Sequence, residues 1–160
     1  MQWRDLVPWL LFVHVLAAIV AIGPNFAYSL IRGMGRQEPQ HANFGVRISH
    51  LISARLVYPV GLVIPATGLA MIAVLGFDLT SRAFWWLDAA IVIYAAVYLY
   101  SFFVQRPIIE QIIELTSSPP GLEGPPRELP ALSARAQRGG TAMLILLVIV
   151  AFLMVVKPQL

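Results

Sequence analysis

Residues 9–30 form the apolar run WLLFVHVLAAIVAIGPNFAYSL. Of its side chains, His14 can take part in the most kinds of chemistry. A neutral imidazole binds haem iron or copper, and it also bridges helices through hydrogen bonds. Four residues of this run recur at intervals of four, three and four and therefore project from one stripe of a helix: His14, Ala18, Ala21 and Asn25. Because a polar group inside a membrane is costly unless it has a partner, we expect this stripe to face protein.

Helical rise places two further candidates near the depth of His14. At about 1.5 Å per residue, His14, Met71 and Tyr94 all lie roughly 9 to 14 Å inside the same end of their expected spans. Two interpretations of His14 stay open. It is either a ligand of haem iron or copper, with Met71 as a soft second ligand, or a hydrogen-bonding bridge to a neighbour such as Tyr94. His50 lies about 20 Å away along the helix axes, so it cannot share one metal with His14 in a single chain.

Asp88 is the only acidic residue within an expected span. It lies one turn inside a pair of tryptophans, where a carboxylate reaches interfacial water and the positive end of a helix. The functional alternative is a hydrogen-bonding row or proton path through Asp88, Tyr94 and His14. Asn25 is a further polar candidate, on the same stripe as His14.

The composition is that of a membrane protein. Of the 160 residues, 59% are apolar and 12% are charged, against roughly half and a quarter in an ordinary soluble domain. The absence of cysteine excludes disulfides, thiolate metal sites and cysteine nucleophiles. No basic cluster with interleaved aromatic residues suggests nucleic acid, and neither a phosphate-binding glycine loop nor a Ser-His-acid arrangement is present.

Four apolar runs are long enough to cross a hydrocarbon layer as helices, which needs about 20 residues each. They cover residues 6–31, 56–77, 85–105 and 139–156. We therefore predict an all-α fold, a single domain over residues 1–160, in which four transmembrane helices form a bundle with loops at 32–55 and 106–138 on one side. Within these loops, 43–58 and 106–115 have amphipathic helical spacing, whereas 117–130 is too rich in Pro and Gly to stay helical.

The Lys and Arg residues are divided unequally between the two sides of such a bundle. Eight of the 11 lie in the 32–55 and 106–138 loops, and three lie on the side that carries both termini. By the positive-inside rule, the two loops face the cytoplasm and both termini face outward.

Three stretches carry the most distinctive pattern: FVHVLAAIVAIGPNFAYSL, PATGLAM and WWLDAAIVIY. Their arrangement, with a basic loop and a proline-bearing second helix, resembles the bacterial family of predicted integral membrane proteins called domain of unknown function 2269. In arrangement that family is similar to the copper-resistance membrane protein D and to the HemJ-type membrane protoporphyrinogen oxidase. The resemblance implies a place in the bacterial inner membrane and a role for His14 in binding haem b or copper.

Three classes of function follow, and whether the protein is an enzyme stays open. The first is a small haem- or copper-associated redox or transport protein. The second is a non-catalytic subunit of a larger membrane complex, and the third is a small oligomeric transporter whose path is lined by His14 and the proline-bearing second helix. Besides lipid, we expect a homo-oligomer or a partner membrane subunit, because small residues on the first two helices allow close approach: Ala17, Ala21, Gly61 and Gly68.

Overall fold

The computed structural model describes residues 3–117 and 126–158, and all regular structure in these two ranges is helical. Six α-helices make up four long rods, since two pairs of helices run on without a break. The helices are α1 (Val7–Gln37), α2 (Ala42–Ile52), α3 (Tyr58–Leu75), α4 (Trp85–Tyr100), α5 (Arg106–Leu115) and α6 (Leu129–Val156). The four rods confirm the predicted all-α bundle, because each is long and apolar enough to cross a membrane.

Two π-helical turns join the paired helices: Ser53–Val57 between α2 and α3, and Ser101–Gln105 between α4 and α5. In each, the amide after the turn donates to a carbonyl five residues back, from Tyr58 to Ser53 and from Arg106 to Ser101. A proline follows immediately in both cases. Proline has no N–H and crowds the carbonyl four residues before it, so a wider turn just ahead of it lets the rod continue.

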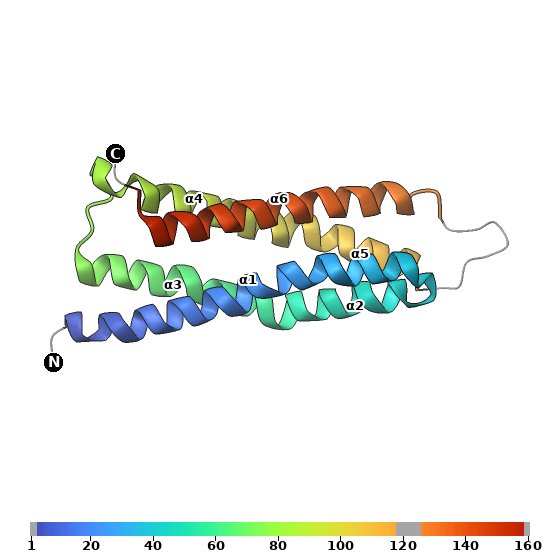
Figure 1. Cartoon of the computed structure of the whole chain (residues 1–160), viewed down its shortest axis with the longest axis horizontal. Coiled ribbons are helices and arrows are strands. Elements are labelled where there is room, and N and C mark those ends of the chain that lie inside the picture. The colour runs from blue at the N-terminus through green and yellow to red at the C-terminus, as the bar shows by residue number, and fades with distance from the viewer. Residues whose placement is uncertain (1–2, 118–125, 159–160) are drawn as a thin grey trace.

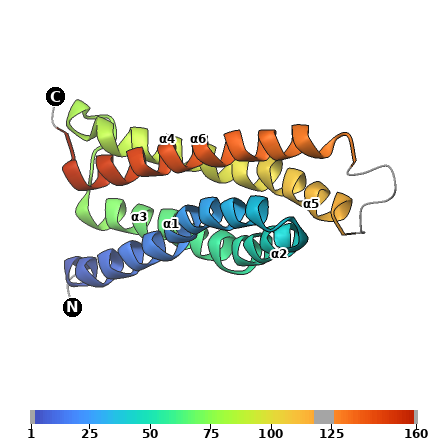
Figure 2. The same ribbon diagram turned by 45° about the vertical axis from the view of Figure 1, so that its right-hand side comes forward.

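The rods form two layers. The α1 helix lies beside α3 and α2 in one layer, and α4 and α5 lie beside α6 in the other (Figure 1). The same pairing is seen after a 45° turn of the bundle (Figure 2). We call the end that holds the start of α1, the end of α6 and the α3–α4 connection the termini end. The opposite end, where α1 turns into α2, is the loop end.

Buried apolar residues form a series of small clusters along the bundle. Nearest the termini end, Trp86, Leu87 and Val150 pack between α4 and α6. Further along, Ala17 and Ala21 pack on Ile64, so that small side chains let α1 approach α3 closely. At the loop end, Ile108 and Ile112 of α5 pack against Ala136 of α6.

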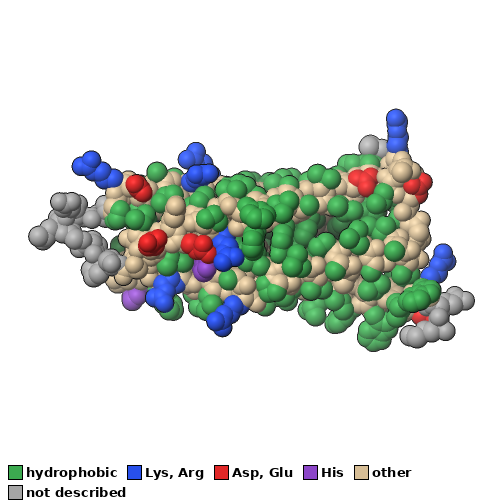
Figure 3. All heavy atoms as spheres, turned by 180° about the vertical axis from the view of Figure 1, so that it is seen from behind, with side chains coloured by type: hydrophobic (Ala, Val, Ile, Leu, Met, Phe, Trp, Pro, Cys, Tyr) green, Lys and Arg blue, Asp and Glu red, His purple; other side chains and the backbone are tan. Residues whose placement is uncertain are grey.

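On the face shown in Figure 3, the middle of the bundle is mostly apolar, and Lys, Arg, Asp and Glu gather toward the two ends. The 31 residues of α1 extend about 46 Å at 1.5 Å per residue, which exceeds a hydrocarbon layer of about 30 Å. The rods therefore project beyond the hydrocarbon, and the charged side chains of α2 and α5 place this projection at the loop end.

The four rods are longer than the predicted spans. The amphipathic spacing at 43–58 and 106–115 is confirmed as helix in α2 and α5. The α6 helix begins at Leu129, ten residues before the predicted span, because the segment LPALSARAQR combines a proline in the first turn with helix-favouring Ala, Leu and Arg. Residues 118–125, inside the segment predicted to be non-helical, lie outside the described ranges.

Candidate functional site: a cationic cavity at the loop end

His14 is paired with a neighbouring helix through Thr67, not through the Tyr94 suggested by depth. The His14 Nδ1 lies 2.9 Å from the Thr67 Oγ1. The Thr67 hydroxyl donates to the Val63 carbonyl at 2.7 Å, so it accepts from His14, and Nδ1 carries the proton. Gly68 makes room for the ring, since a Cβ there would lie 3.4 Å from the His14 Cε1.

Tyr94 replaces a donor that proline removes. The N–H at position 65 would have bonded to the Gly61 carbonyl, but this residue is Pro65. The Tyr94 hydroxyl donates to that carbonyl at 2.7 Å, and the Tyr98 hydroxyl donates to the Tyr58 carbonyl at 3.1 Å. Each hydroxyl bonds to backbone and not to the next side chain, so these tyrosines clamp α4 onto α3.

The other predicted residues are dispersed. Asn25 Nδ2 donates to the Ala21 and Ile22 carbonyls of its own helix, both at 3.1 Å. Asp88 makes no hydrogen bond or ion pair with any described residue. Met71 lies one turn from Thr67 on α3, toward the termini end. In the part of the chain that the structure describes, no group of three His, Cys, Asp or Glu side chains is placed to hold a metal ion.

The small residues expected to form an interface between copies are used inside the chain. Ala17 and Ala21 are buried against α3. Gly61 faces α4, where an added Cβ would lie 3.1 Å from the Tyr98 ring, and Gly68 faces His14. These residues therefore explain the packing of one chain, and the predicted oligomer needs support from elsewhere.

A cavity of about 290 Å³ lies toward the loop end, and we call it the loop-end cavity. It lies between the two layers and is walled by α1, α2, α5, α6 and both π turns. A second cavity of about 40 Å³ continues from it toward the termini end, and the two have Asn25, Val57, Tyr58, Ser101 and Met143 in common. The rest of the smaller cavity is mostly apolar, with Ile22, Val97 and Leu147 in its wall.

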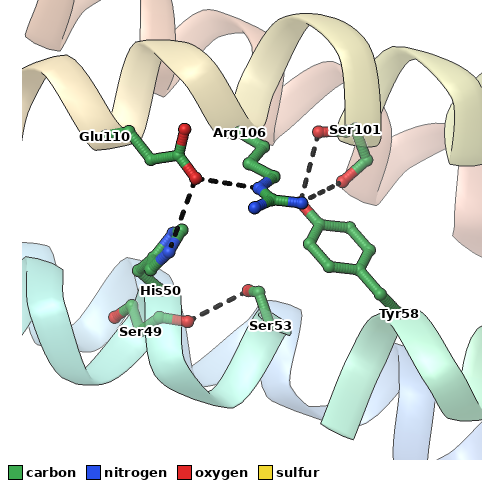
Figure 4. Close-up of polar contacts among 7 residues, drawn as sticks. All are labelled: Ser49, His50, Ser53, Tyr58, Ser101, Arg106 and Glu110. Atoms are coloured by element: carbon green, nitrogen blue, oxygen red, sulfur yellow. Dashed lines mark hydrogen bonds and ion pairs between the residues drawn. The ribbon is translucent and has the colours of Figure 1, made fainter. Parts of the chain in front are cut away.

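Three guanidinium groups line the loop-end cavity, and only one of them has a carboxylate partner. Arg106 Nε donates to Glu110 Oε1 at 2.8 Å, and His50 Nε2 lies 3.8 Å from the same oxygen (Figure 4). Arg36 donates to the Gln137 amide oxygen at 2.7 Å. Arg32, which is partly buried, makes no hydrogen bond or ion pair with any described residue. The cavity therefore has an excess of positive charge.

The π turns place polar groups in the cavity wall. Tyr28 donates to the Ser53 hydroxyl at 2.8 Å, and Ser53 donates onward to a carbonyl of α2. Across the bundle, the Tyr58 hydroxyl donates to the Ser101 carbonyl at 3.2 Å (Figure 4). Interruptions of this kind in membrane helices are tolerated where they line a cavity, and π turns are frequent at functional sites.

Two features of the sequence mark this site. The segments SARLVYP and SFFVQRP both have serine six residues before proline, and each forms a π turn. Arg32 and Arg36 are one helical turn apart, where two cations repel each other unless something anionic lies between them. By the positive-inside rule alone, these arginines indicate only the orientation of the bundle.

The fold and this site define a class: a small all-α integral membrane protein with an internal cationic cavity. The chain belongs to the family described as predicted integral membrane protein (DUF2269), which it matches over residues 8–158. No curated protein and no solved structure matches it.

Proposed function

We propose that this protein binds an amphiphilic anion in the loop-end cavity, as a small carrier or transporter. The observation that carries the proposal is the pair Arg32 and Arg36, which face a cavity of about 290 Å³ without a carboxylate partner among the described residues. A guanidinium is a planar fork of donors that matches carboxylate and phosphate groups. Cations placed against a cavity in an otherwise apolar bundle therefore favour an anionic ligand.

The smaller cavity supports an amphiphile over a simple ion. It leads from the cationic cavity toward the middle of the bundle, where Ile22, Val97 and Leu147 replace the charged residues. A ligand with its anionic group against Arg32 and its apolar part along these side chains would match both environments. This proposal belongs to the third class of function, a small transporter. The arginines and the π turns, instead of His14, line its path.

The test is a titration of the full-length protein in a neutral detergent. Dodecyl phosphate is compared with dodecylphosphocholine, which has the same chain and no net charge. We expect tighter binding of dodecyl phosphate, and Arg32→Gln should weaken it roughly 10- to 100-fold, since a hydrogen bond to a charged group contributes about 1.5–3 kcal/mol.

Arg138→Gln is the matched control, because Arg138 is exposed on α6 and is not part of the cavity wall. It should leave the affinity unchanged. Equal affinity for the two amphiphiles, or equal losses in the two variants, would contradict the proposal.

The orientation of the bundle is part of the same proposal. The eight-to-three division of Lys and Arg favours a cytoplasmic loop end in a bacterial inner membrane, so the cavity would receive its ligand from the cytoplasmic side. Reporter fusions at the C-terminus test this. We expect a C-terminal reporter to be active outside the cytoplasm. Reporter activity in the cytoplasm would mean that the orientation is the reverse of the proposed one.

A haem or copper site at His14 is a second candidate, favoured by one observation. Because Nδ1 donates to Thr67, Nε2 is the nitrogen left to coordinate, and such an orienting hydrogen bond is typical of metal-binding histidines. Met71 lies one turn from Thr67 on α3, and its thioether is a soft ligand for haem iron or copper. With no third ligand close by in the described ranges, the site would need a ligand from a second copy or from solvent.

Absorption spectra and metal analysis of the purified protein test this candidate, after expression with haem precursor and copper supplied. His14→Gln should abolish the haem band or the bound copper, and Met71→Leu should weaken or shift it. Wild-type protein without haem or metal would leave His14 as an interhelical hydrogen-bonding residue.

A further inference from the structure

The charges around the loop-end cavity do not balance. Among the described residues, its lining contains three arginines and neither Asp nor Glu. Glu110, which is not part of the lining, accepts from Arg106 at 2.8 Å and lies 3.8 Å from His50, so it neutralises one of the three guanidinium groups (Figure 4). No other described carboxylate forms an ion pair with a lining residue. The cavity therefore keeps two positive charges, on Arg32 and Arg36, when His50 is neutral.

These two arginines reach the same stretch of α6. They leave α1 one helical turn apart. Arg36 donates to the Gln137 amide oxygen at 2.7 Å, and a Cβ on Gly140 would lie 3.4 Å from an Arg32 guanidinium nitrogen. Positions three apart on a helix are neighbours on one face, with about 5–6 Å between their Cβ atoms. Two like charges held this close repel each other, and a single anion between them would relieve the repulsion.

Both guanidinium groups are placed where a ligand can reach them. Each belongs to the cavity lining, with Arg36 exposed and Arg32 half-buried. The hydroxyls near the π turns are less available as donors, because those of Tyr28, Ser53 and Tyr58 already donate within the chain. A ligand in this cavity is therefore recognised chiefly through its negative charge.

We propose that the bound anion is doubly charged, with a phosphate monoester as its head group. This inference rests on the proposed function and deepens it by naming the substrate class. A phosphate monoester has about two negative charges above pH 7, and its three terminal oxygens can accept from two guanidinium groups at once. A singly charged head group, such as a sulfate ester or a phosphodiester, leaves one of Arg32 and Arg36 uncompensated.

The test compares two amphiphiles that have the same chain and the same tetrahedral head-group shape. Both are added as minor components of neutral-detergent micelles that hold the full-length protein. At about pH 8, dodecyl phosphate has roughly two negative charges and dodecyl sulfate has one. We expect dodecyl phosphate to bind roughly tenfold more tightly, since its second charge meets a second guanidinium. Dodecylphosphocholine, which has no net charge, should bind more weakly than both.

Arg36→Gln removes the second positive charge and keeps a polar side chain, so it should bring the ratio of the two affinities close to one. Arg138→Gln is the matched control, because Arg138 is an exposed arginine of α6 outside the cavity lining. It should keep the wild-type ratio. Since both amphiphiles are measured on one preparation, the ratio does not depend on how much of a variant is folded.

Inorganic phosphate separates a lipid source of the phosphate group from a soluble one. It has about the same charge as dodecyl phosphate at this pH and no chain. We expect it to displace dodecyl phosphate only at a much higher concentration, because it makes no use of the apolar wall of the smaller cavity. Displacement at equal concentration would mean that a soluble phosphate is the ligand, and would overturn the amphiphilic part of the proposed function.

The remaining outcomes separate the two proposals. Equal binding of dodecyl phosphate and dodecyl sulfate by the wild type, above that of dodecylphosphocholine, overturns the preference for a doubly charged head group and leaves the anion site standing. A wild-type ratio that survives in Arg36→Gln overturns the preference as well. If neither anionic amphiphile binds above dodecylphosphocholine, the proposed function itself fails.

Discussion

The contact between α1 and α3 around His14 and the loop-end cavity contain similar polar side chains, but they use them differently. Around His14, polar groups are paired within the chain: the imidazole with Thr67, and Tyr94 with the carbonyl that Pro65 leaves free. In the cavity, Arg32 has no hydrogen-bond or ion-pair partner within the described ranges. A polar residue inside a membrane bundle is therefore a weak sign of function by itself. An unpaired one beside a cavity is a stronger sign.

Gly139→Ala should have the largest effect, because at Gly139 the α6 helix packs tightly against the end of α4 and the second π turn. The new methyl would lie 2.6 Å from Gln105 Oε1 and 2.7 Å from the Tyr100 hydroxyl. Gln105 is buried and held by its bond to Ala136, so overpacking should destabilise the protein by about 1–3 kcal/mol, measured by thermal unfolding in detergent.

Gly140→Ala is the control for that change, since its methyl would meet only side-chain nitrogens, the nearest an Arg32 guanidinium nitrogen at 3.4 Å. It should have a much smaller effect on stability. Equal effects of the two alanines would mean that the contact between Gly139 and Gln105 is not tightly packed.

Tyr94→Phe tests the paired region next. Without its hydroxyl, the Gly61 carbonyl has neither a helical donor nor a side-chain donor, and a buried unpaired carbonyl costs about 1–3 kcal/mol. Tyr98→Phe should cost less, because the Tyr58 carbonyl faces Leu62, which has an N–H to donate. The two variants are compared by their unfolding midpoints, and a larger loss in Tyr98→Phe would contradict the replacement of the proline donor.

The hydrogen bond between His14 and Thr67 should contribute less. Interhelical hydrogen bonds in membranes average about 0.6 kcal/mol, so a double-mutant cycle of His14→Asn and Thr67→Val should give a coupling near that value. A coupling above about 2 kcal/mol would exceed the range of such bonds and would show that His14 does more than bridge two helices.

Asp78, in the connection between α3 and α4, should give the smallest effect. The Thr80 hydroxyl and amide donate to its carboxylate at 2.6 and 2.9 Å, and these bonds lower the pKa of Asp78 below its usual value. Since the folded-state pKa is the lower one, the stabilisation is present above the unfolded pKa of about 3.9 and is lost as the pH falls through the folded value. The unfolding midpoints of wild type and Asp78→Asn should therefore differ slightly at pH 6 and converge below pH 4. A difference between the two unfolding midpoints that persists below pH 4 would show that ionisation of Asp78 does not cause it.

The bundle itself could be predicted from the sequence, because the length of an apolar run and the thickness of a membrane fix the number of rods. The helical extension of α5 was equally readable from its amphipathic spacing. The start of α6 at Leu129 was not, since the segment before Gly139 is polar and only helix propensity marks it. The partner of His14 was also missed. Thr67 and Tyr94 lie at similar depths in their spans, and depth does not show which helix packs against α1.

The cavity could not be predicted, since it depends on how four rods diverge around two π turns. Pro59 and Pro107 can be read in the sequence, but they do not show where the space opens. Gln105 looked like the polar end of a span, and its burial follows from the glycines of α6, which allow two helices to approach there. Sequence patterns show what a residue can do chemically, and packing decides which of its atoms are left unpaired.

The most direct test of the central claim is to locate the ligand. An alkyl phosphate with a photoreactive diazirine in its chain is bound to the wild-type protein in detergent and irradiated, and the labelled residues are mapped by peptide mass spectrometry. The account predicts labels on the walls of the two cavities, at Val57, Val97 and Met143, and a loss of these labels in Arg32→Gln. Labels confined to the exposed outer face of the bundle, at Leu99 and Phe103, with no change in Arg32→Gln, would contradict it.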